Sequence, residues 1–220
     1  MTQQSIGLVS MYAVKEIYYT VQCEGNQTGM PAVFIRFSGC NLWNGLESGR
    51  KSAICKFCDT DFVGTDGPGG GKFKTAEELA QAVDEKWSGG DRNKMVVCTG
   101  GEPLLQLDTV AVAALRNKGF RVSVETNGTQ LPPIGGVDWL CVSPKYGSEM
   151  VLTWGNEIKL VYPQEGFTPE QFSHMDFDHF YLQPMDGPNT AENTAAAVEY
   201  CMSNAQWRLS PQVHKMIGLR

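Results

Sequence analysis

Three cysteines are spaced in a way that could hold a metal centre. Cys55 and Cys58 form a C-x2-C pair, and Cys40 precedes Cys55 by fifteen positions, which gives the pattern C-x14-C-x2-C. The C-x2-C turn lets two thiolates converge, and a loop of fourteen residues can return a third. Iron–sulfur cubanes normally take four thiolates. Three thiolates would therefore leave one iron of a cubane open to bind a substrate or cofactor.

A zinc site of three cysteines and one histidine is the alternative, because structural zinc normally has four protein ligands. The histidines all lie far along the chain from these cysteines: His174, His179 and His214. Three further cysteines lie in apolar segments, where small core roles are expected: Cys98, Cys141 and Cys201. The odd total of seven also argues against a disulfide framework. These residues alone favour a cluster and leave zinc open.

The composition describes an ordinary globular chain. Its 220 residues suit one domain, with 42% hydrophobic and 19% charged residues. A net charge of −6 provides no general basic surface, which disfavours a nucleic-acid partner. No apolar run is long enough to cross a membrane, and residues 1–10 lack the pattern of a secretory signal. We expect a cytoplasmic protein with a short extension at residues 1–10 and a single domain over residues 11–220.

Strand-like and helix-like segments alternate along the chain, which is typical of parallel β/α units. We expect strands at residues 32–37, 95–98, 120–125, 139–142, 158–162, 180–182 and 207–209, and helices from residue 75, at 107–118 and at 191–203. Only a loop separates Glu125 from Trp139. The expected fold is therefore α/β, an incomplete and partly degraded (β/α) barrel. Residues 40–71 are expected to form a long functional loop, closed by a flexible glycine-rich connector at residues 67–71.

Polar or glycine-containing clusters follow five of the expected strands: Ser38–Cys40, Thr99–Pro103, Glu125–Gly128, Ser143–Lys145 and Gln183–Asp186. In parallel β/α folds, ligands bind at the carboxyl ends of the strands. Because these ends meet at one rim, the five clusters predict a single site there.

Taken together, these motifs resemble those of radical S-adenosylmethionine (SAM) enzymes. The shared features are three cysteines after a first strand, an aromatic residue before the last of them (Phe57), and a Gly-Gly-Glu motif after the next strand (Gly100–Glu102). The usual superfamily spacing is C-x3-C-x2-C, so the gap of fourteen residues departs from it. That gap is similar to the one in 7-carboxy-7-deazaguanine synthases.

The resemblance to this family runs through eight ordered motifs: Val21–Gly25, Arg36–Trp43, Cys58–Phe62, Thr99–Pro103, Glu125–Gly128, Ser143–Lys145, Gln183–Asp186, and Trp207–Ser210 with His214–Lys215. It implies a barrel of the radical SAM type and a lyase that converts 6-carboxy-5,6,7,8-tetrahydropterin to 7-carboxy-7-deazaguanine with loss of ammonia, in 7-deazapurine and queuosine biosynthesis. It further implies a [4Fe–4S] cluster, SAM, Mg2+, an external flavodoxin-like one-electron reductant, and a homodimer.

The resemblance also implies roles for individual residues. The cluster ligands would be Cys40, Cys55 and Cys58, and the Mg2+ ligand would be Thr60. SAM would contact Phe57, Cys58, Asp59, Gly101, Ser143, Lys145, Gln183, Pro184, Met185 and Asp186. The substrate would contact Val21, Gln22, Cys23, Arg36, Thr99, His214 and Arg220. Glu125 and His214 are the candidate catalytic residues.

Simpler interpretations exist for several of these residues. Gly100 and Gly101 could form a tight turn, Arg36 could be a partly exposed residue at a strand end, and Thr60 could be a turn residue. The sequence also departs from the family pattern at two positions, with Cys23 in place of a glycine and Val213 in place of a threonine. The rival functions are another small radical SAM enzyme, such as a glycyl-radical activase, and a zinc-stabilised binding module.

Overall fold

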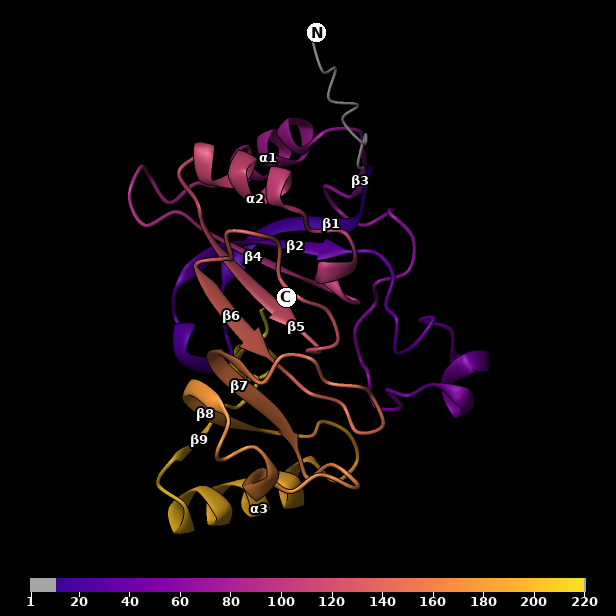
Figure 1. Cartoon of the computed structure of the whole chain (residues 1–220), viewed down its shortest axis with the longest axis vertical. Helices are drawn as coiled ribbons and strands as arrows, with labels where there is room; N and C mark the ends of the chain where they lie inside the picture. The colour runs from indigo at the N-terminus through magenta and orange to yellow at the C-terminus, as the bar shows by residue number, and fades with distance from the viewer. Residues whose placement is uncertain (1–10, 220) are drawn as a thin grey trace, which may run out of the picture.

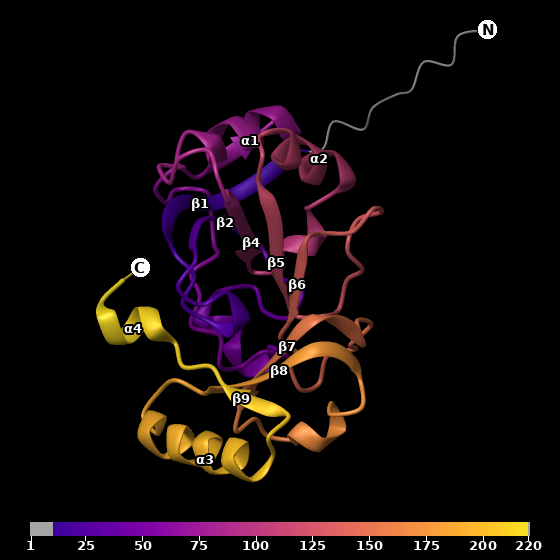
Figure 2. The ribbon, with the colours of Figure 1, turned by 90° about the vertical axis from the view of Figure 1, so that its left-hand side faces the viewer.

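One curved sheet organises the protein, which we describe over residues 11–219 from a computed structural model. The expected extension at residues 1–10, and Arg220, lie outside the described residues. In spatial order the described strands are β3 (Gly71–Phe73), β1 (Tyr12–Val21), β2 (Pro31–Phe37), β4 (Met95–Gly100), β5 (Arg121–Thr126), β6 (Trp139–Val142), β7 (Trp154–Tyr162), β8 (Asp176–Pro184) and β9 (Trp207–Leu209). The sheet curls from β1 to β9 without closing, as Figures 1 and 2 show. The incomplete barrel expected from the sequence is confirmed.

Strand direction divides the sheet into two parts. Neighbouring strands from β2 through β9 are parallel, whereas β1 pairs antiparallel with both β2 and β3. The carboxyl ends of the parallel strands therefore meet at one rim, where the motifs are gathered. The antiparallel edge was not expected from the sequence.

Helices cover only parts of the convex face of the sheet. The described α-helices are α1 (Ala76–Asp84), α2 (Thr109–Asn117), α3 (Thr190–Ser203) and α4 (Val213–Ile217), and the 3-10 helices are η1 (Gly25–Gln27), η2 (Glu47–Ser52), η3 (Pro103–Leu105) and η4 (Pro169–Gln171). Helices α1 and α2 cover the β1–β5 half and α3 covers β8 and β9 (Figure 1). No α-helix lies between β5 and β6 within the described residues, which explains the partly degraded barrel.

The helix ends follow their capping residues. Thr75 Oγ1 accepts a hydrogen bond from Glu78 N at 3.1 Å, and Asp108 Oδ1 accepts one from Ala111 N at 2.8 Å. Such caps satisfy N–H groups that have no partner within the helix. Helix α2 thus begins at Thr109, after Asp108, rather than at residue 107 as the apolar pattern indicates.

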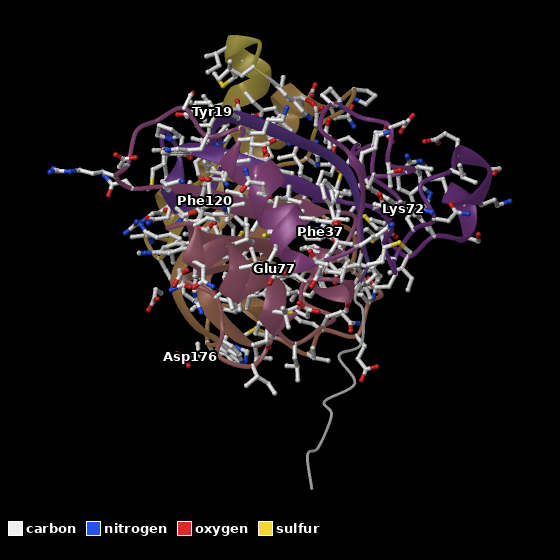
Figure 3. The ribbon with its side chains drawn as sticks, turned by 90° about the horizontal axis from the view of Figure 1, so that it is seen from above. Tyr19, Phe37, Lys72, Glu77, Phe120 and Asp176 are labelled. Carbon is white, nitrogen blue, oxygen red and sulfur yellow. The ribbon has the colours of Figure 1, made fainter. Side chains whose placement is uncertain are left out.

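The core lies between the sheet and these helices. Leu79 of α1 and Leu115 of α2 are fully buried, as is Phe37 of β2. Figure 3 looks onto the helical side, with Glu77 on α1, Phe37 and Phe120 in the interior of the view, and Lys72 and Asp176 nearer its edges. Within residues 11–219, none of the helices has the length and hydrophobicity needed to cross a bilayer.

The glycine-rich segment at residues 67–71 packs against β1. Ile17 N donates to Pro68 O at 2.9 Å, and Gly67 N donates to Lys15 O at 2.9 Å. A β-carbon on Gly70 would lie 2.1 Å from Lys15 O, so only glycine permits this approach. The expectation of a flexible connector was wrong: Gly67, Gly69 and Gly70 lie against the backbone of β1, where a side chain would not fit.

Candidate active site

A cavity of about 570 Å3 opens at the carboxyl ends of the strands. It brings together nearly all the site residues expected from the sequence: Val21, Gln22, Cys23, Arg36, Cys55, Phe57, Cys58, Asp59, Thr60, Thr99, Gly101, Glu125, Ser143, Lys145, Gln183, Pro184, Met185, Asp186 and His214. Cys40 does not line it directly but lies against Gly101, which does. Arg220 is outside the described residues. Side chains almost 200 positions apart in sequence therefore share one cavity.

The three cysteines are free thiols: Cys55 and Cys58 line this cavity, and Cys40 lies against Gly101 of the cavity wall. A hydrogen bond joins Cys55 and Cys58, and it raises the pKa of Cys55 and lowers the pKa of Cys58. Burial opposes the lowering at Cys58, whereas the N–H and hydroxyl of Thr60 lower the pKa of Cys58 further. Burial raises the pKa of Cys40, whose sulfur accepts a hydrogen bond from Leu42 N at 3.4 Å. N–H groups directed at sulfur are the kind of contact that tunes iron–sulfur clusters.

The donor set fits a cubane better than a single ion. Across the described residues, no three histidine, cysteine, aspartate or glutamate side chains converge as ligands of one ion. A zinc site therefore has neither its first three ligands in place nor a histidine to complete it. A cubane binds each thiolate at a different iron, so its ligands stand farther apart. Three free thiols with N–H donors to their sulfurs are compatible with that arrangement.

Gly100 and Gly101 allow the end of β4 to lie close to β2 and to Cys40. Gly100 has φ +140°, and a β-carbon there would lie 2.3 Å from Phe37 O. A β-carbon on Gly101 would lie 2.0 Å from Gly39 O. The glycine pair is thus explained by backbone packing, which seats Cys40 at the rim.

Glu102 connects two of the expected motifs. Its side chain is fully buried and accepts hydrogen bonds from Leu104 N at 3.0 Å, Thr126 Oγ1 at 2.8 Å and Asn127 N at 2.8 Å. Burial raises the pKa of Glu102, while these donors oppose the shift. The Gly-Gly-Glu motif and the Glu125–Gly128 motif are therefore held together by one carboxyl group.

Glu125 stands among donors at the centre of the cavity. Gln22 Nε2 donates to its Oε1 at 3.0 Å, and Thr99 Oγ1 donates to its Oε2 at 3.1 Å. Lys159 Nζ lies 3.5 Å from Glu125 Oε1 and forms a second ion pair with Glu24. This row of polar groups crosses the cavity from the end of β1 to β7.

Arg36 is held by two neighbours on β1. Its Nε donates to Glu16 Oε1 at 2.8 Å, and its Nη2 donates to Tyr18 OH at 3.0 Å. Its side chain is 19% exposed, lies one position before the end of β2 and lines the cavity, so a partly exposed place at a strand end is compatible with a role in the site. Its guanidinium can still grip an anionic group with the remaining N–H donors.

Two further polar side chains line the cavity, Lys145 and Gln183. Lys145 Nζ donates to Ser143 Oγ at 2.6 Å and lies 5.9 Å from the centre of the Phe57 ring. Burial lowers the pKa of Lys145. Gln183 Oε1 is buried and, among the described residues, has no hydrogen-bond partner, so it is an acceptor available to a ligand.

Helix α4 contributes two residues to the cavity wall, His214 and Lys215. Lys215 Nζ donates to Asp59 Oδ2 at 2.7 Å and to Asp186 Oδ2 at 2.6 Å. His214 Nδ1 lies 4.0 Å from Glu24 Oε1. Val213 N donates to Cys23 O at 3.2 Å, so the two positions that depart from the family pattern are in direct contact. The sequence predicted no helix here, because five residues are too few for a periodic pattern.

The cavity residues that the sequence did not predict include Glu24 and Lys159, which form an ion pair with each other. Glu24 lies within the Val21–Gly25 motif, so its place in that motif was a usable signal. Lys159 lies two positions after Glu157 in the apolar strand β7, and both point to the same side. Alternating charged residues in a buried strand are a second usable signal.

Comparisons with known proteins agree with this site. The family described as the radical SAM superfamily matches residues 52–210, a range that begins after Cys40. A 7-carboxy-7-deazaguanine synthase from Caulobacter vibrioides is 61% identical over 94% of this chain and 99% of its own length. The enzyme of that name from Bordetella pertussis is 56% identical over 94% and 99% of the two chains. The crystal structure of QueE from Escherichia coli has the same fold, with a TM-score of 0.67, 24% identity, and coverage of 96% of this chain and 99% of that one.

The fold and the thiol site thus define a radical SAM enzyme, a class that implies a [4Fe–4S] cluster and SAM. The similarity of this chain to these relatives extends over almost the whole length of each protein. Within that superfamily, the chain belongs to the family of 7-carboxy-7-deazaguanine synthases.

Proposed function

We propose that this protein converts 6-carboxy-5,6,7,8-tetrahydropterin to 7-carboxy-7-deazaguanine with loss of ammonia, a step in 7-deazapurine and queuosine biosynthesis. The observation that carries the proposal is a single cavity with thiols at one side and, across it, the donor and acceptor row formed by Gln22, Thr99 and Glu125. A pterin offers matching groups: a planar edge of N–H donors and a carboxylate.

The substrate would lie between this row and Arg36. Glu125 accepts from N–H groups of the heterocycle, and Arg36 binds the carboxylate by paired charge-assisted hydrogen bonds. Val21, Gln22 and Cys23 contribute from the end of β1, Thr99 from β4 and His214 from α4. We also propose Arg220 as a substrate contact. Glu125 and His214 are the groups proposed to hold or move protons at the heterocycle.

The cluster would be held by Cys40, Cys55 and Cys58, with SAM beside it. When bound, the pair supplies radical initiation by one-electron cleavage of the sulfonium bond. The protein's part is placement: Gly101 admits the methionine end, Ser143 and Lys145 offer a hydroxyl and an ammonium, and Gln183 offers its unpaired acceptor. The remaining contacts come from residues already placed on the cavity wall: Phe57, Cys58, Asp59, Pro184, Met185 and Asp186.

Mg2+ would bind at Thr60, next to the substrate carboxylate. The Thr60 hydroxyl donates to Cys58, and its oxygen keeps lone pairs for a hard cation. We further propose an external flavodoxin-like reductant, a homodimer and a cytoplasmic location. Arg36, Thr60 and His214 all line the cavity, and this set favours the pterin over the protein substrate that a glycyl-radical activase would need.

The test is an anaerobic assay with reconstituted cluster, reductant, SAM, Mg2+ and the carboxytetrahydropterin, scored by mass spectrometry for 7-carboxy-7-deazaguanine. We expect product in stoichiometric excess over enzyme. SAM cleavage without any deazaguanine would refute the substrate assignment while leaving the radical SAM assignment intact.

A further inference from the structure

Lys159 is a buried cation between two carboxylates of the cavity. Its side chain is 6% exposed, compared with 15% for Glu24 and 21% for Glu125. Its Nζ forms an ion pair with Glu24 and lies 3.5 Å from Glu125 Oε1. All three side chains line the cavity, and they come from β7, the loop after β1, and β5.

A buried ammonium is costly to desolvate, and removing one member of a buried ion pair leaves the other uncompensated. Burial tends to lower the pKa of Lys159, but Glu125 and Glu24 raise it well above its usual range. For the Glu24 carboxyl group, burial acts to raise the pKa. The pKa of Glu24 is nevertheless lowered, chiefly by Lys159. The ammonium therefore keeps Glu24 ionised in a space that disfavours charge.

Without the ammonium, two carboxylates would face each other across the vacated position. Both carboxylates lie against the same ammonium, so in its absence each would disfavour ionisation of the other. A protonated Glu125 would lose acceptor capacity. As a carboxylate it keeps lone pairs for a ligand beyond those used by Gln22 and Thr99.

We propose that Lys159 is a positioning residue whose ammonium pairs with both Glu24 and Glu125, so that Glu125 is held as an acceptor for hydrogen bonds from the N–H edge of the substrate heterocycle. The proposal rests on the proposed function, because it takes a pterin as the ligand. Lys159 itself does not have to touch the substrate.

Other charged and titratable groups surround these residues. Lys159 also faces Cys141 on β6 and Glu157 on its own strand. Arg36 on β2 interacts with Glu125, and His214 on α4 interacts with Glu24. Lys145 also interacts with Lys159. All of these side chains are present in both parent and variant, so the two proteins differ only in the side chain at position 159.

The experiment measures equilibrium binding of pterin-6-carboxylate, an oxidised and unreactive pterin, to cluster-loaded protein with SAM and no reductant. Calorimetry between pH 6.0 and 7.5 gives the dissociation constant without any turnover. The variants are Lys159→Met, Glu24→Gln and the double variant, with thermal unfolding as the check on folding.

We expect Lys159→Met to bind at least about tenfold more weakly at pH 6.0 (roughly 1.4 kcal/mol) and to recover as pH rises, because a carboxyl group with a raised pKa ionises again. The parent should change much less over this range. In the double variant Glu125 no longer faces a second carboxylate, so its affinity should return to within about threefold of Glu24→Gln. Such recovery is the signature of coupling between the two positions.

A Lys159→Met protein that folds and binds as tightly as the parent at pH 6.0 would overturn the proposal. So would a double variant that binds no more tightly than Lys159→Met, since that result indicates loss of packing rather than of charge. If Lys159→Met does not fold, the double variant decides: affinity about tenfold below that of Glu24→Gln overturns the proposal, and affinity within threefold supports it. A parent that does not bind the pterin at all refutes the substrate class instead.

Discussion

Gly101 and Cys40 approach so closely that a β-carbon on the glycine would lie 2.9 Å from the β-carbon of the cysteine. The same added carbon would lie 2.0 Å from Gly39 O, a backbone atom that cannot rotate away. The end of β4 and the entry to the cysteine loop are thus in contact through a residue without a side chain.

Gly101→Ala should therefore displace the segment that carries Cys40. We expect the variant to lose most of its iron and sulfide after anaerobic reconstitution, with weaker SAM binding measured by calorimetry. Gly71→Ala is the matched control, because its β-carbon would meet only the Phe73 ring at 3.9 Å, an ordinary contact. Full iron content in Gly101→Ala would show that the contact relaxes without affecting the site.

Cys40, Cys55 and Cys58 should each be indispensable for the cluster, because loss of one leaves two thiolates for four irons. Alanine at any of them should abolish the brown chromophore and SAM cleavage. Cys98→Ala, Cys141→Ala and Cys201→Ala should keep both, since Cys98 and Cys141 are buried in the sheet and Cys201 is half-buried on α3. A Cys55→Ala protein that retained four irons and full activity would contradict the assignment of Cys55 as a cluster ligand.

Thr60→Ala should still form the cluster but lose most of the activation by added Mg2+. The reason is the loss of a hydroxyl oxygen, a ligand type that suits this cation. Initial rates across a Mg2+ titration check this, with iron content measured on the same samples. Equal responses in parent and variant would mean that the metal binds elsewhere or is not used.

Cys23→Gly should leave the Michaelis constant for the carboxytetrahydropterin within about threefold, because under roughly 1 kcal/mol of backbone flexibility is at stake. The Cys23 thiol donates to Val21 O at 3.2 Å, a contact within its own loop. Its amide donates to Gln22 Oε1 at 2.8 Å, which ties the loop to a residue of the polar row. Glycine preserves that amide contact.

Steady-state kinetics at saturating SAM measure this constant for both proteins. A change of about tenfold in either direction would show that the thiol fills or narrows the pocket. Cys201→Ala serves as the control for removing a thiol elsewhere, because α3 lies outside the cavity lining.

The parallel part of the sheet, and the motifs that lie at its rim, could be predicted from the sequence. Apolar runs such as residues 32–37 and 95–98 are buried on both faces, so they are visible without their partners. The motifs at their carboxyl ends had to meet at one rim, because parallel strands end on the same side. The cysteine spacing likewise predicted thiols on one loop.

The contacts that join distant segments could not be predicted from the sequence and are seen only in the folded chain. Strand β1 mixes polar and apolar residues, and its pairing with the glycine-rich segment at residues 67–71 depends on a backbone contact that composition does not show. Lys159 is 34 positions from Glu125 and 135 from Glu24, and it becomes their common counter-charge only when the sheet curls. Short-range sequence patterns indicate which residues prefer to be buried. Which buried charged side chains come into contact depends on the curvature of the sheet, and no local sequence pattern specifies that curvature.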